Sequence, residues 1–68
     1  MTMEWLTVGD QELHCYINGV AQGGIKYSRL KDGWYWVGFT LNPYKQFSAN
    51  LDLYGGKGSV ERALMAPV

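Results

Sequence analysis

The sequence predicts an α+β domain that is mainly β: a small antiparallel meander sheet of four or five strands, with one or two short helices and the C-terminal helix packed on the sheet. Two observations predict this class. Several stretches alternate apolar and polar residues, as half-buried strands do, and turn dipeptides such as "NG" and "DG" separate them. The chain has 68 residues, so we expect residues 1–68 to form one small domain that buries only about 60% of its unfolded surface.

The first half of the chain reads as strands joined by tight turns. "EWLTV" (4–8) is a short strand, and "ELHCYI" (12–17) alternates Leu13, Cys15 and Ile17 with polar positions. "NG" at 18–19 predicts a hairpin turn, because both residues tolerate positive φ. The return strand begins at "VAQ", "GG" at 23–24 indicates a bulge or bend, and "IKYSRL" (25–30) continues it. "WYWVGFTL" (34–41) is the next strand.

The loop "KDG" (31–33) sets the register of the two central strands. We expect a three-residue loop with Gly33 in the left-handed conformation, which pairs Leu30 with Trp34. A two-residue loop is the alternative, but we expect a poorer cross-strand pairing from it. The chosen register places Trp34 and Trp36 on one face beside Lys26 and Ser28. The opposite face then holds Ile25, Tyr27, Arg29, Tyr35, Val37, Phe39 and Leu41.

The C-terminal part is predicted to be a loop, a strand and a helix. "NP" (42–43) can open a helical turn, so residues 42–50 are either a short helix or an irregular loop. "LDLY" (51–54) reads as the last strand. "SVERALMA" (59–66) reads as a helix capped by Ser59, with Pro67 beyond its end. Its residues Val60, Ala63 and Leu64 are expected to face the sheet.

The glycine-rich stretch before that helix is a candidate anion site. Backbone N–H groups at a helix start bind anions, and glycine lets a phosphate approach closely. The candidate residues are Gly56, Lys57, Gly58 and Ser59. The order of Lys and Gly departs from the Walker pattern, so we favour a flexible connector between strand and helix.

Aromatic and basic side chains form the second candidate site. An aromatic sheet face with a few charges is typical of a protein interface, and it can also stack unpaired bases. The remaining alternative is that the tryptophans are ordinary core and the other face is exposed. The candidate partner-binding residues are Lys26, Arg29, Trp34, Tyr35 and Trp36.

The residues give little support to catalysis, so we expect that the protein is not an enzyme and needs no cofactor. His14 and Cys15 are adjacent in a strand, so their side chains point to opposite faces and cannot form a dyad. One cysteine excludes an intrachain disulfide, and a structural zinc site needs four ligands. The net charge is zero, which argues against duplex DNA and anionic membranes as partners.

The chain also gives an expectation about location. No stretch approaches the ~20 apolar residues that cross a bilayer. The N-terminus "MTMEWLTVGD" lacks the basic start and apolar run of a signal peptide. We therefore expect a cytoplasmic protein.

The chain as a whole resembles a known group of proteins. Its length, the start "MTM", the "NG" and "DG" turns, the "DGWYW" strand and the C-terminal helix are similar to small accessory proteins of phages and mobile elements. Anti-CRISPR and anti-restriction inhibitors belong to that group. The resemblance implies a non-enzymatic protein that docks on a larger host protein or complex and blocks it sterically. A single-stranded nucleic-acid or nucleotide binder using Trp34, Trp36 and Lys57 is the alternative, and a homodimer through the aromatic face is a third.

Overall fold

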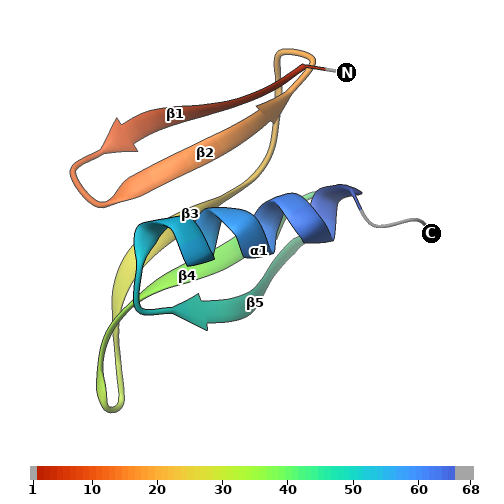
Figure 1. Cartoon of the computed structure of the whole chain (residues 1–68). Helices are drawn as coiled ribbons and strands as arrows, with labels where there is room; N and C mark the ends of the chain where they lie inside the picture. The colour runs from red at the N-terminus through yellow and green to blue at the C-terminus, as the bar shows by residue number, and fades with distance from the viewer. Residues whose placement is uncertain (1, 66–68) are drawn as a thin grey trace.

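A computed structural model describes residues 2–65 and confirms the predicted fold class: a five-stranded antiparallel meander with one helix on it (Figure 1). The strands follow one another in the sheet in the order of the sequence. They are β1 (Met3–Gly9), β2 (Glu12–Ile17), β3 (Val20–Leu30), β4 (Gly33–Leu41) and β5 (Tyr44–Asn50), and the helix is α1 (Leu53–Met65).

The turn between β2 and β3 forms as the sequence predicts. Asn18 and Gly19 have φ angles of 51° and 82°, the positive values that a two-residue hairpin turn requires. The bulge expected at the glycine pair lies one residue earlier. Tyr16 pairs with Ala21 and Cys15 with Gly23, so Gln22 is the extra residue.

The predicted register between β3 and β4 is wrong by one residue. Leu30 pairs with Gly33, so only Lys31 and Asp32 form the turn. Tyr27 therefore lies opposite Trp36, and Arg29 lies opposite Trp34. Because side chains alternate along a strand, a shift of one residue moves the whole of β4 to the other face.

Residues 44–50 form a strand, which corrects the expected helical turn or loop. Asn42 and Pro43, joined by a cis peptide bond, make the turn, and β5 then pairs with β4 from Leu41↔Tyr44 to Trp36↔Asn50. The backbone groups at the edge of β4 are satisfied by this pairing, whereas a short helix there would leave that edge unpaired.

The helix begins six residues earlier than predicted. "LDLY" is not a strand: Asp52 precedes α1, and its carboxylate accepts a hydrogen bond from the Gly55 backbone N–H, the usual N-cap interaction. Ser59 is not the cap. It lies inside the helix, where its hydroxyl donates to the Gly55 carbonyl. The expected helix end at Ala66, and Pro67 beyond it, lie outside the described residues.

Packing explains why one of the three helical glycines, Gly56, is favoured at its position. Each glycine costs about 1 kcal/mol in a helix relative to alanine. A Cβ on Gly56 would lie 3.1 Å from the Trp36 Cβ and 3.5 Å from the Ile25 Cγ2, so glycine lets α1 approach the sheet closely. The fully buried Val60 lies over two sheet glycines, Gly23 and Gly38, which have no side chains to displace it.

The core lies between α1 and one face of the sheet. Its fully buried side chains are Cys15, Ile25 and Val60. Leu64 packs against them, as predicted, whereas Ala63 is exposed. We call this side of the sheet the helix face and the other side, on which the described residues place no helix, the open face.

Candidate functional site

The structure divides the five predicted partner-binding residues between the two faces. Arg29, Trp34 and Trp36 share the helix face with Ile25, because the observed register aligns them. Lys26 and Tyr35 belong to the open face. The prediction that Lys26 neighbours the two tryptophans on one surface is therefore wrong, and its cause is the one-residue shift in the turn.

Three aromatic rings form a continuous row on the helix face. The Tyr27 ring lies 5.0 Å from Trp36 and 5.5 Å from Trp34, measured between centroids, and it stacks on Trp34 at an interplanar angle of 21°. We call these residues, Trp36, Tyr27 and Trp34, the ring row. Its inner end is covered, because Trp36 lies beneath Gly56 of the helix. Its outer end is open, and Trp34 is 46% exposed.

The ring row extends along a hairpin that the helix does not fully cover. Figure 1 shows the end of the β3–β4 hairpin projecting past the N-terminal end of α1. Arg29, the cross-strand partner of Trp34, is exposed on the same face. Lys31 in the turn is also exposed. The end of the hairpin thus presents a stacked, pre-ordered tryptophan beside an arginine.

Tyr35 lies on the other side of this hairpin. Hydrogen bonding to the Asp32 carboxylate, followed by partial burial and the negative charge of Asp32, raises the pKa of the Tyr35 phenol above its ordinary value. The hydroxyl is therefore un-ionised at neutral pH.

A second aromatic cluster, which the sequence did not lead us to expect, lies on the open face. Phe39 is only 5% exposed although no described helix covers it. The His14 ring meets it edge-on at 5.7 Å, and the Tyr44 ring lies 5.7 Å away on another side. Gly24 makes this possible, since a Cβ there would come within 2.8 Å of the Phe39 ring.

The only histidine has a structural environment. Its Nε2 lies 2.7 Å from the Glu12 Oε2, and its ring packs on Phe39. Cys15 is fully buried on the opposite face, as the strand alternation predicts. Burial, followed by the charge of Glu61, raises the pKa of the Cys15 thiol. Neither side chain is available to the other as a nucleophile or base.

The predicted anion site does not exist as a loop. Gly56, Lys57, Gly58 and Ser59 all lie within α1, and the N-cap of this helix is Asp52. The Lys57 ammonium lies 5.8 Å from the centroid of the Trp5 ring, on β1. The Trp5 indole N–H in turn donates to the Glu61 Oε2 at 2.8 Å. Lys57 therefore helps join the helix to the first hairpin.

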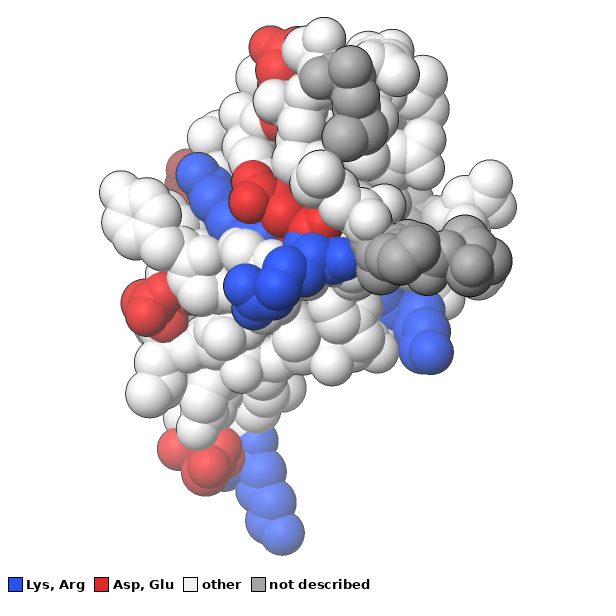
Figure 2. Space-filling view, turned by 45° about the vertical axis from the view of Figure 1, so that its right-hand side comes forward, with Lys and Arg blue, Asp and Glu red and all other residues white. Residues whose placement is uncertain are grey.

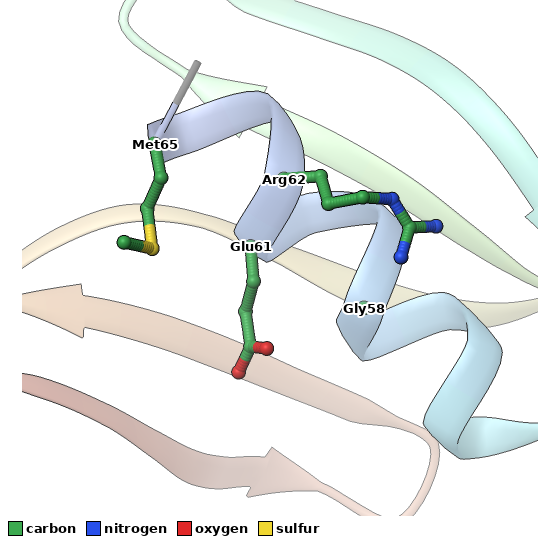
Figure 3. Close-up of a pocket in the computed structure, with 4 residues that line it drawn as sticks. All are labelled: Gly58, Glu61, Arg62 and Met65. Atoms are coloured by element: carbon green, nitrogen blue, oxygen red, sulfur yellow. The ribbon is translucent and has the colours of Figure 1, made fainter.

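A shallow, open pocket lies on the helix surface. Gly58, Glu61, Arg62 and Met65 line it, and all four belong to α1. Figure 3 shows Glu61 pointing toward the β1–β2 hairpin, away from Arg62. Because the Glu61 carboxylate already binds Trp5, the pocket does not bring several free polar groups together on a ligand.

Charges of both signs are interspersed on the surface. On the face of the molecule that Figure 2 shows, Lys and Arg lie beside Asp and Glu, without a broad basic area. Within residues 2–65, no cluster of three or more His, Cys, Asp or Glu side chains could hold a metal ion. In the same residues, no helix has the length and apolar character needed to cross a membrane.

The comparisons with known proteins give no match: no protein family, no curated protein and no solved structure is significantly similar to this chain.

Proposed function

We propose that this protein is a non-enzymatic protein-binding module whose contact site is the exposed end of the ring row, with Trp34 at its centre and Arg29 beside it. The observation that carries the proposal is the stacking of a 46% exposed Trp34 on Tyr27. Trp, Tyr and Arg are the residues most enriched at binding hot spots. A ring that is already held by its neighbour loses little conformational entropy on binding.

The partner class follows from the form of this site. The projecting hairpin is narrow and offers one large apolar group and one or two cations. Such a shape fits a concave acidic or apolar surface on a larger protein. Steric blocking of a host protein, as phage and mobile-element inhibitors do, needs no catalytic group and is the mode of action we propose.

The proposal is tested with substitutions of two exposed aromatic side chains, Trp34 and Tyr54, for which the expected results differ. The chain is immobilised, incubated with lysate of a candidate host, and the retained protein is identified and purified. Trp34→Ala should weaken its binding by about thirtyfold, the usual effect of a hot spot. The matched control is Tyr54→Ala, which removes an exposed aromatic ring from α1 and should leave the affinity unchanged.

Two results would contradict the protein-binding site. One is equal affinity of the Trp34→Ala variant and the unaltered chain. The other is an equal loss on Tyr54→Ala, which would place the interface on the helix.

A second candidate function has one specific observation in its favour. Arg29 and Lys31 lie on the same hairpin as the exposed Trp34, so a base could stack on the indole while the cations contact its phosphate. This reading predicts binding of an oligothymidylate that weakens steeply with salt. Retention of a protein at both low and high salt, with no oligonucleotide bound, would favour the first proposal.

A further inference from the structure

Among residues 2–65, no strand pairs with the outer edge of β1, which therefore has a regular set of free backbone groups. Thr2 faces β2, since its carbonyl accepts from the Asn18 N–H at 2.8 Å and its N–H donates to the Asn18 side chain. Backbone groups alternate in direction along an antiparallel strand. The N–H and C=O groups of Met3, Trp5 and Thr7 therefore point away from β2, toward the open edge.

The pairing of β2 with β3 independently supports this direction of the β1 backbone groups. The Tyr27 N–H donates to the Gln11 carbonyl, so the backbone groups of Leu13 and Cys15 face β3. On β1, Thr7 lies opposite Leu13 and Trp5 lies opposite Cys15. These two β1 residues therefore make no backbone hydrogen bonds to β2.

This edge has few of the features that normally prevent pairing. The strand "MEWLTVG" contains neither Lys nor Pro, and Glu4 is its single charge. The pairing of β1 with β2 is irregular only at Val8, which has no partner on β2 and follows the outward residues Met3, Trp5 and Thr7. The opposite edge differs: β5 carries Lys45 and is interrupted within the strand, where Phe47 is the extra residue. The backbone of α1 lies nearest to β3, β4 and β5, so the helix axis lies toward that other edge.

We propose that two copies of this chain pair through their β1 strands, antiparallel about a two-fold axis at Trp5, to form one continuous sheet. This register matches Met3 with Thr7 of the second copy, Trp5 with Trp5, and Thr7 with Met3. Each pair exchanges two backbone hydrogen bonds. It is the register that uses every outward residue, and it is self-complementary, as a two-fold interface must be.

The side chains are compatible with the same register. Glu4 lies opposite Leu6 of the second copy, so no like charges face each other, and Leu6 is 47% exposed in the single chain. On the helix face, each Trp5 is accompanied by one acid, Glu61, and one base, Lys57. On the helix face, the two copies therefore meet without an excess of either charge. This surface is distinct from the ring row, so the two proposals can fail independently.

The register is tested by a pair of opposite charges at one exposed position. In each of the two symmetry-related pairs, Leu6→Glu places a carboxylate opposite Glu4 of the other copy, and Leu6→Lys places an ammonium group there. Both variants lose the same leucine, so the loss of its apolar side chain is matched between them. The symmetry applies each change twice, and we expect the dimer dissociation constant of Leu6→Glu to exceed that of Leu6→Lys by about tenfold.

Sedimentation equilibrium from about 10 μM to about 1 mM covers the range of weak dimers. The unaltered chain should approach twice its mass of 7.7 kDa. Hydrogen exchange on the same samples should show the Trp5 and Thr7 amides becoming protected as the concentration rises. A chain that stays monomeric throughout would overturn the proposal, as would equal dissociation constants for the two Leu6 variants. Concentration-independent exchange of the Trp5 amide would also overturn it.

Discussion

Two glycines of the helix should respond in opposite ways to the same substitution. Gly56 and Gly58 both lie inside α1, only two residues apart. A Cβ on Gly56 would meet the Cβ of Trp36 at 3.1 Å, an atom fixed by the sheet backbone. A Cβ on Gly58 would meet only the Arg62 Nη1 at 3.3 Å, the far end of a flexible side chain. The pair Gly56→Ala and Gly58→Ala therefore separates helix propensity from packing.

The magnitudes follow from two opposing terms. Alanine gains about 0.5–1 kcal/mol over glycine in a helix at either position. Overpacking of a close contact costs about 1–3 kcal/mol, and it applies to Gly56 alone. Gly58→Ala should thus raise the free energy of unfolding by up to about 1 kcal/mol, while Gly56→Ala should lower it by about 1 kcal/mol. In a domain of this size, 1 kcal/mol shifts Tm by about 4–8 °C.

Thermal and urea unfolding, followed by tryptophan fluorescence and far-ultraviolet circular dichroism, measure both variants against the unaltered chain. The difference between the two variants is the decisive quantity, because the propensity term cancels. If Gly58→Ala destabilises as much as Gly56→Ala, this stretch is not a regular helix and the packing argument fails. A gain in both variants would show that α1 does not approach Trp36 as closely as described.

Two further predictions concern the helix cap and the buried thiol. Asp52→Ala should lower the free energy of unfolding by about 0.5–2 kcal/mol, because it removes the capping oxygen. Asp52→Asn keeps a capping oxygen and should lower this free energy much less. Equal losses of stability for the two variants in urea unfolding would exclude the cap. Cys15 should react with a thiol reagent only after unfolding, since it has no exposed surface. Its raised pKa means that the unfolded chain releases the thiol proton first as pH rises past about 8.5. The free energy of unfolding should therefore fall there, and Cys15→Ala should flatten this pH dependence.

The local elements of the sheet could be predicted because their causes are local. Asn18 and Gly19 adopt positive φ by their own chemistry, and the alternation of Leu13, Cys15 and Ile17 indicates a strand without reference to any neighbour. Trp34 and Arg29 were identified as candidates from residue type and from a predicted register that is wrong by one residue. Their common location on one hairpin face required the register, as did the separation of Lys26 and Tyr35 from them.

The sequence by itself determined the fold class, most strand positions and the first hairpin turn. Only the tertiary structure decided the β3–β4 register, the helical state of the glycine-rich stretch and the strand at residues 44–50. The physical reason is the same in each case. The two-residue turn is favoured over a three-residue turn because it lets the Tyr27 ring pack between those of Trp34 and Trp36. Glycines with poor helix propensity become helical when Gly56 can lie directly against the sheet. These contacts join residues distant in sequence, and their packing energy outweighs the local preference.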